Sequence, residues 1–234
     1  MALSLGTGIY TNGAESSANH SHIASKTWTN GHVFFLGVNC LGDEGANPAT
    51  EPTVSDGALN WTNIGTYRYA VGDMRATLFR LVGDGSTSAP IIDFAGVTQV
   101  RVLWAVADGD GLNATTPVVA SSFKSAYYAG AGNNTPTVTL NAFADATNNG
   151  LLLWVMSTYQ TSAAPEAGIT ELFDDLGNSS RFGWMGWRLG EDTTPSCTLA
   201  ANATSWIALG CELAAAASGN HPRVSAFALQ QMSQ

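Results

Sequence analysis

Histidines are the first residues through which this chain could do chemistry. The sequence holds four, at His20, His22, His32 and His221. His20 and His22 form an H-x-H pair, and on a strand two such residues share one face. A zinc site needs further nitrogen, sulfur or carboxylate ligands, and the surrounding segment ANHSHIAS carries no cysteine or carboxylate. We therefore expect a solvated or hydrogen-bonded pair and no metal.

Carboxylates could bind a hard cation or catalyse hydrolysis. The stretch Asp108–Gly111 (DGDG) resembles a fragment of a calcium loop, but it lacks the later acidic ligands of an EF-hand. A hairpin loop is the expected role, because Asp and Gly readily adopt turn conformations. Glycoside hydrolysis needs two carboxylates across a cleft, and no acidic strand motif suggests such a pair. A G-x-S-x-G nucleophile motif is also missing. The sequence therefore predicts a protein that is not an enzyme and needs no cofactor.

Tryptophans could instead stack on a glycan or a partner protein. Trp184 and Trp187 lie three residues apart in RFGWMGWRLG, so on a regular strand they face opposite sides. One of the two is then expected in the core and the other on the outer face, unless a bulge at Gly186 realigns them. Trp184 and Trp187 are the candidate ligand or interface residues. The other tryptophans that lie in apolar strand runs are expected in the core: Trp61, Trp104, Trp154 and Trp206.

Composition excludes several classes of partner. Among 234 residues there are nine Lys plus Arg, and the formal net charge is −9. Neutralising phosphates needs a basic patch, so neither nucleic acid nor an anionic membrane surface is an expected partner. No apolar run is long enough to span a bilayer, and the first residues do not read as a signal peptide. The three cysteines are expected to be buried free thiols in a reducing compartment.

Strand patterns separated by Gly, Asn, Asp and Pro clusters recur along the chain. HVFFLGVNC (His32–Cys40) is nearly all apolar, as in a central strand. In RATLFRLV, residues Leu78, Arg80 and Val82 point one way, and the residues between them point the other way. About 11–13 such strands predict an all-β antiparallel β-sandwich or jelly roll.

The ends of the chain differ from its middle. We expect an N-terminal arm over residues 1–27, a β-sandwich domain over 28–214 and a C-terminal arm over 215–234, both arms being extended. Asn141–Gly150 could form a single helical turn, and Glu212–Ala217 either a short helix or a continued strand. No internal repeat of fixed period is visible.

The order of these motifs resembles a group of phage and prophage virion proteins with concanavalin-like or jelly-roll sandwiches. The resemblance covers roughly residues 28–214, and it implies a sandwich and a place in a virion. It is carried by the following segments: LNWTNIG (Leu59–Gly65), LFRLVGDG (Leu78–Gly85), IIDFAGVTQVRVLWAV (Ile91–Val106), TVTLNAFADATNNGLLLWV (Thr137–Val155), GITELFDD, the W-R strand that follows it, and IALGCEL.

These observations favour a phage structural protein of the head surface, a decoration or cement protein that stabilises the shell. The expected partners are the major capsid protein or other virion proteins and further copies of the chain, and the expected location is the virion, assembled in the host cytoplasm. The alternative is a tail or adhesin module that binds carbohydrate through an exposed aromatic residue. A polysaccharide-degrading enzyme is the third hypothesis.

Overall fold

A computed structural model describes residues 3–6, 19–43, 48–57, 59–69, 73–130, 132–158, 162–175, 181–200 and 205–217. Regular structure in these residues consists of strands alone, and all strand pairs are antiparallel. The expected all-β antiparallel fold is therefore confirmed.

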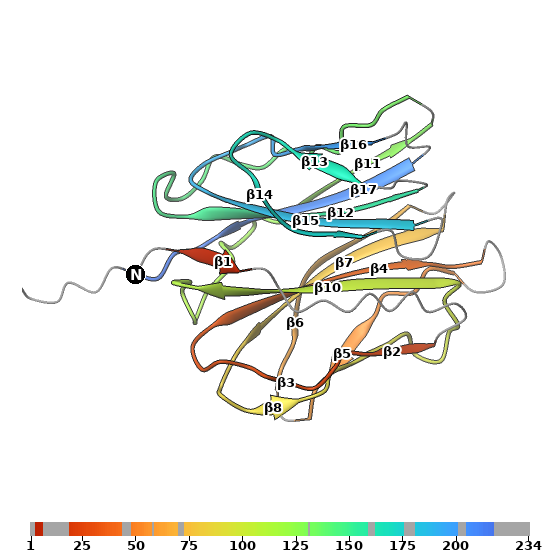
Figure 1. Cartoon of the computed structure of the whole chain (residues 1–234), viewed down its shortest axis with the longest axis horizontal. Helices are drawn as coiled ribbons and strands as arrows, with labels where there is room; N and C mark the ends of the chain where they lie inside the picture. The colour runs from red at the N-terminus through yellow and green to blue at the C-terminus, as the bar shows by residue number, and fades with distance from the viewer. Residues whose placement is uncertain are drawn as a thin grey trace, which may run out of the picture.

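Two five-stranded main sheets form the centre of the molecule (Figure 1). In sheet order, the first main sheet consists of β1 (Ser4–Gly6), β10 (Arg101–Asp110), β4 (Val33–Leu41), β7 (Met74–Val82) and β6 (Thr62–Tyr69). The second consists of β11 (Lys124–Ala129), β17 (Ser205–Leu213), β12 (Gly150–Thr158), β15 (Arg181–Leu189) and β14 (Thr170–Asp175). The main hydrophobic core lies between the two sheets and includes Phe35, Trp154 and Met185.

A smaller outer layer covers the far face of each main sheet, so that four layers are stacked in Figure 1. Each outer layer encloses its own hydrophobic cluster, which contains Trp104 in the first case and Trp184 in the second. The first outer layer holds β2 (His20–His22), β9 (Ile91–Asp93) and β5 (Thr53–Ser55), together with the pair β3 (Lys26–Thr27) and β8 (Thr87–Ser88). The second holds β13 (Ala163–Pro165) and β16 (Cys197–Leu199).

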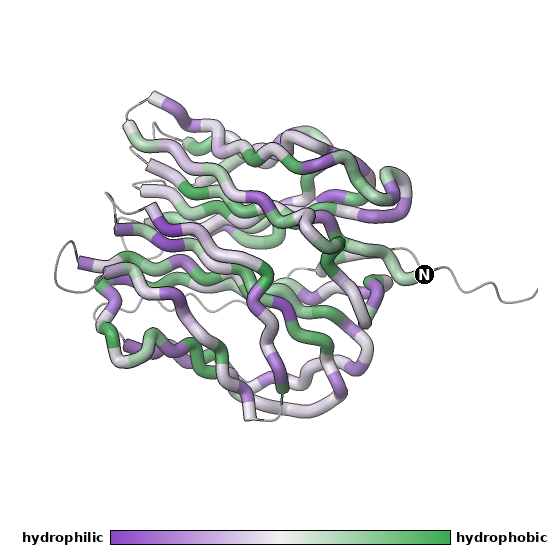
Figure 2. The backbone as a smooth tube through the Cα atoms, turned by 180° about the vertical axis from the view of Figure 1, so that it is seen from behind, coloured by the Kyte–Doolittle hydropathy of each residue, from purple (hydrophilic) through white to green (hydrophobic). Residues whose placement is uncertain are grey.

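Covering both faces explains the nearly continuous apolar strands. All nine residues of β4, β12 and β17 are buried, because each strand lies between two hydrophobic clusters. The alternation expected for β7 is confirmed: Leu78 packs between the main sheets, whereas Phe79 and Leu81 pack under the outer layer. Figure 2 shows hydrophobic residues along the central strands of both sheets.

Each half of the chain follows the same path. Residues 3–110, the first unit, pass from β1 through β2 and β3 of the outer layer to β4, then to β5, to β6 and β7, to β8 and β9, and back to β10. Residues 124–217, the second unit, repeat this alternation, with Thr137 bridging to Ser196 in the outer layer. In chain order, both main sheets have the strand order first, fifth, second, fourth, third. The sandwich therefore consists of two units in which the chain alternates in the same way between a main sheet and an outer layer.

The two units also share their strand register. Val33, the first residue of β4, faces Val82 of β7 and Gly109 of β10. Gly150, the first residue of β12, likewise faces the last residues of β15 and β17. Each unit has one β-bulge, after Asn63 in β6 and after Glu171 in β14. Residues at the same place in this common register are called matched positions below.

A pseudo-twofold axis relates the units. Strand β17 packs beside β7, and β10 packs beside β15, which are matched pairs of strands. Gly37 and Trp154 are themselves matched, and they touch: a Cβ added to Gly37 would overlap the Trp154 ring. Matched residues in contact place the axis between them. The sequence showed no repeat, because matched positions carry residues as different as glycine and tryptophan.

The structure tests the expected N-terminal arm and the two segments that could form short helices. Strands β1, β2 and β3 lie within residues 1–27, and Leu3, Leu5 and Ile23 are buried, so the described part of the expected N-terminal arm belongs to the sheets. Apolar side chains hold it there. Of the expected C-terminal arm, residues 218–234 lie outside the described part of the chain. The single helical turn expected within Asn141–Gly150 is present, closed by a hydrogen bond from the Asn149 amide to the Asp145 carbonyl at 3.1 Å. Glu212–Ala217 forms no helix, and β17 continues to Leu213.

Candidate functional site

Trp184, one of the two expected ligand-binding aromatics, is fully buried in the second outer cluster. Its indole Nε1 donates a hydrogen bond to Glu171 Oε2 at 2.9 Å, and its ring lies over Gly186, where a Cβ would overlap it. Trp184 therefore cannot stack on a ligand in this structure. The prediction of an exposed face fails here because the outer layer covers this side of the sheet.

Trp187 faces the opposite side from Trp184, as expected from their spacing, and packs against the core between the main sheets. It is partly buried, and its Nε1 is enclosed without a hydrogen-bond partner. Gly186 and Trp187 keep regular pairing with β12, so no bulge in that pair realigns the tryptophans. The other four tryptophans expected in the core are buried there: Trp61, Trp104, Trp154 and Trp206.

An open groove of about 400 Å³ lies on the first unit, between β5 and the β6–β7 edge. Rings of Trp61 and Phe79 line its floor and are 6% and 3% exposed. Trp61 is fixed from behind, because its Nε1 donates to Asp56 Oδ2 at 3.2 Å and its ring meets Trp28 edge-on. The groove therefore presents ring carbon atoms and not the indole N–H. We call it the aromatic groove.

Polar side chains form one wall of the aromatic groove. Glu51 accepts hydrogen bonds from Asn63 Nδ2 at 2.8 Å and from Arg75 Nη1 at 3.3 Å, one on each carboxylate oxygen. Arg75 is held in turn by the Ala49 carbonyl at 2.9 Å and by Thr66 Oγ1 at 3.1 Å. The carboxylate is thus oriented and electrically balanced before any ligand arrives, which reduces the cost of binding.

Within the described residues of the second unit, no such polar wall lies at the matched place. Glu171, matched to Asn63, accepts its hydrogen bond from the indole of Trp184. In the first unit the position matched to Trp184 carries Thr77, whose hydroxyl lies 3.0 Å from that of Thr66. The Glu51–Asn63 pair is consequently not covered by an indole from β7.

A second hollow, of about 280 Å³, lies at one end of the first main sheet and is lined by Ser4, Gly6, His32, Asp108 and Asp110. His32 Nδ1 lies 2.8 Å from Asp108 Oδ1, and Nε2 lies 4.0 Å from Asp110 Oδ1. Both imidazole nitrogens therefore face carboxylates. Ser4 lines the same hollow but makes no hydrogen bond to the imidazole.

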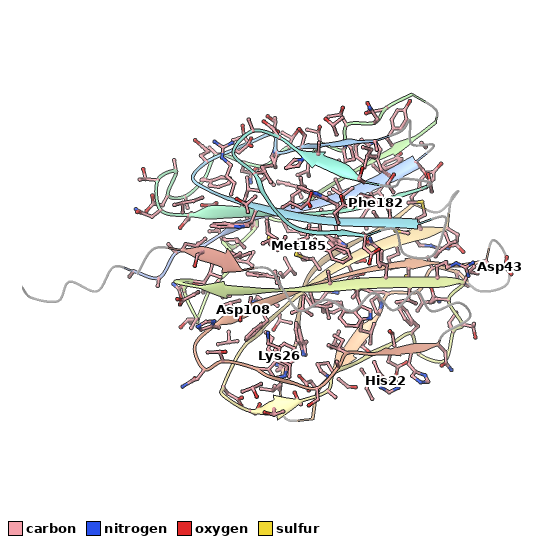
Figure 3. All side chains as sticks on the ribbon, viewed as in Figure 1. His22, Lys26, Asp43, Asp108, Phe182 and Met185 are labelled. Atoms are coloured by element: carbon pink, nitrogen blue, oxygen red, sulfur yellow. The ribbon has the colours of Figure 1, made fainter. Side chains whose placement is uncertain are left out.

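Lys26 lies on the outer-layer side of this hollow (Figure 3). Its Nζ is 3.9 Å from Asp108 Oδ2 and 4.9 Å from the centroid of the Phe34 ring. Burial lowers the pKa of the Lys26 ammonium, and the Asp108 charge acts in the opposite direction. The expected hairpin at Asp108–Gly111 is wrong for its first residues, because Asp108, Gly109 and Asp110 belong to β10 and face Gly6, Leu5 and Ser4 of β1.

The His32–Asp108 pair has a counterpart at the matched positions of the second unit, the buried pair Asn149–Glu212. Asn149 precedes β12 as His32 precedes β4, and Glu212 is matched to Asp108. Asn149 Nδ2 donates to Glu212 Oε1 at 2.6 Å, and both residues are buried. The Ala144 amide donates to the same carboxylate oxygen at 2.8 Å. The pair therefore fastens the loop before β12 to β17, and a structural role of this kind also accounts for His32–Asp108.

The remaining candidates from the sequence are the histidine pair of β2 and the three cysteines. His20 and His22 share the exposed face of β2, with ring centroids 5.0 Å apart, and His20 Nδ1 lies 2.6 Å from Asn19 Oδ1. Among the residues with described positions, no three His, Cys, Asp or Glu side chains are placed to hold a metal ion. All three cysteines are free and buried, as expected, and burial raises the pKa of each thiol to about 12.

One exposed aromatic side chain was not predicted from the sequence. Tyr127 of β11 is half exposed and stacks on Tyr67 and Tyr69 of β6, with ring centroids 5.3 and 5.5 Å apart. These three rings join the edge strands of the two main sheets. Sequence reasoning missed this seam and the aromatic groove, because both depend on which edge strands become neighbours.

Comparison with models of protein families, with curated proteins and with solved structures finds no match. No helix long and apolar enough to cross a membrane occurs within the described ranges.

Proposed function

We propose that this chain is a structural protein of a phage virion, a decoration or cement protein on the head surface that acts through protein–protein contacts and not by catalysis. The observation that carries the proposal is the tandem of two all-β units with the same strand order. We interpret each unit as a variant of the jelly roll, which is a recurrent fold of viral capsid proteins. A fold alone does not define a function. The order of sequence motifs that resembles phage virion proteins adds independent support.

The surface chemistry supports the same role. Charged residues make up only 12% of the chain, and interface cores are depleted in charge. The strands β6 and β11 are edge strands of their sheets and lie side by side, and the backbone groups of edge strands can pair with another chain. Copies of the chain that bridge neighbouring capsid subunits would add many weak contacts by multivalency.

Composition of purified particles tests the proposal. Mass spectrometry of virions from the phage or prophage that encodes the chain is expected to find it in a fixed ratio to the major capsid protein. Immunogold labelling is expected on the heads. Particles that lack the protein should release their genome at lower temperature. Absence from purified particles, or labelling restricted to tails, would overturn the proposal.

Self-association belongs to the same proposal, and sedimentation of the purified full chain measures it. A particle whose mass is a multiple of 24.4 kDa is expected. A monomer both alone and in mixture with capsid protein would contradict the expected homo-oligomer.

Carbohydrate recognition by a tail or adhesin module is the second candidate function. Lectin domains also use jelly rolls, and one observation favours this role, the aromatic groove with its preformed polar wall. The buried Trp184 does not support it.

A further inference from the structure

We infer that the aromatic groove binds a neutral saccharide, with its hydroxyl groups on Glu51 and Asn63 and its C–H groups against the narrow exposed strips of Trp61 and Phe79. The inference rests on the second candidate function and is independent of a role in the virion head.

The size and shape of the groove limit the ligand. A volume of about 400 Å³ falls in the lower part of the range of small-molecule sites. The groove is open, so it suits one or two rings of a longer chain that continues into solvent. The rings of its floor offer only narrow apolar strips, because both are almost completely buried. A purely apolar ligand would therefore gain little contact area.

The hydrogen-bonding groups define the ligand's chemistry. Glu51 is half exposed and accepts one hydrogen bond on each oxygen, from Asn63 and Arg75, so its carboxylate has further acceptor capacity. Asn63 contributes an amide group, and Thr53 of β5 also lines the groove. Hydroxyl groups both donate and accept, so they can satisfy a carboxylate and an amide together. If the groove instead bound an aromatic side chain of a partner protein, most polar groups of this wall would lose water without gaining a hydrogen bond, which would weaken binding.

Charge selects a neutral sugar over an acidic one. Arg75 lies 3.3 Å from Glu51 Oε2 and balances that carboxylate. The whole chain carries a formal charge of −9, and a second carboxylate brought beside Glu51 would be repelled. None of the described residues that line the groove is a Lys or an Arg.

The test is titration of the full chain with a panel of neutral methyl glycosides of glucose, galactose, mannose and N-acetylglucosamine, followed by ¹H–¹⁵N NMR. At least one glycoside is expected to shift the Trp61 indole and Asn63 side-chain resonances in a saturable way. Asn63→Ala and Glu51→Gln should weaken that binding by about tenfold, as expected for loss of one buried polar contact of about 1.4 kcal/mol. The Trp61 resonance is identified with Trp61→Phe.

Asp43→Asn is the matched control, because it removes one exposed carboxylate that does not line the groove. It should leave binding unchanged. Equal melting temperatures show that the variants are folded. Two outcomes overturn the inference: no glycoside of the panel moves the groove resonances, or N-acetyltryptophanamide moves them and the glycosides do not. Particle composition is measured separately, so failure here leaves the virion proposal untouched.

Discussion

Hydrogen bonding and burial both distinguish the two tryptophans of β15. The Trp184 indole donates to Glu171, whereas the Trp187 indole N–H is enclosed without a partner. Trp184 is also fully buried and Trp187 only partly, so substitution by Phe removes more buried contact at Trp184 as well as its hydrogen bond. An enclosed donor without a partner is itself unfavourable.

We expect Trp184→Phe to lower the free energy of unfolding by about 1–3 kcal/mol more than Trp187→Phe does. Urea unfolding of the two variants and the unchanged protein measures the difference. Equal losses would show that the Trp184–Glu171 hydrogen bond contributes nothing.

The three thiols make stability depend on pH in the alkaline range. Burial holds the pKa of Cys40, Cys197 and Cys211 at about 12 in the folded protein, whereas an unfolded cysteine titrates near about 8.5. Between these values the folded state binds more protons. Its stability is therefore complete below the unfolded pKa and falls as pH rises toward the folded pKa.

Urea unfolding at pH 7 and pH 10 should show a loss of stability at pH 10, and Cys211→Ala should reduce that loss. A disulfide-exchange reagent such as DTNB should label no thiol of the native protein at pH 8 and all three in urea. Rapid labelling without urea would contradict the burial of these groups.

At the level of elements, Asp108 of β10 and Glu212 of β17 occupy matched positions but differ in burial and in their hydrogen-bond partners. Glu212 is buried and accepts from the Ala144 amide and from Asn149. Asp108 is partly exposed, and its main partner is His32. Removal of a buried acceptor leaves its donors unsatisfied, whereas water can replace an exposed one.

We therefore expect Glu212→Ala to cost about 2–4 kcal/mol and Asp108→Ala less than about 1 kcal/mol. Thermal or urea unfolding of the pair measures this. Because the two residues share a register position, each variant controls for loss of a carboxylate at that place. If Asp108→Ala lowered the free energy of unfolding more than Glu212→Ala did, the His32–Asp108 pair would contribute more to stability than the Asn149–Glu212 pair.

The central strands could be predicted from sequence, because their signal is local. The continuous apolar run His32–Cys40 predicted the central strand β4, and alternation placed Leu78 and Phe79 on opposite faces. The opposite orientation of Trp184 and Trp187 was also predictable. Exposure of one of them was not, because it depends on whether a distant segment such as β13–β16 covers that face.

The groove and the seam depend on contacts between segments far apart in sequence. Glu51 meets Arg75, which is 24 residues away in sequence, and Tyr127 of the second unit meets Tyr67 of the first. The sequence pattern around Glu51 or Tyr127 therefore does not predict which residue each of them contacts. For the same reason DGDG looked like a turn, although pairing with β1 extends β10 through Asp110.

At the level of the whole molecule, the two units share one core and should unfold together. Phe35 and Ala105 come from the first unit and Trp154 and Met185 from the second, all in one cluster (Figure 3 labels Met185 between the sheets). Neither main sheet could keep this face buried if the other unfolded. Cooperative unfolding follows from such a shared core.

Calorimetry is expected to give one transition, with a van't Hoff enthalpy equal to the calorimetric enthalpy. Trp154→Ala should destabilise both units at once, since its ring fills the space above Gly37. Two separate transitions in the unchanged protein would show that each unit is stable alone.

Contact between Gly37 and Trp154 makes the two halves non-interchangeable. At a true dyad each residue would face its own copy, so two glycines would leave a void and two indoles would collide. Joining both halves in one polypeptide removes that constraint, because the second unit can supply the Trp154 ring and the first unit the space above Gly37. A hypothetical homodimer of either half alone would lose this fit, so the asymmetry commits the molecule to its covalent tandem form.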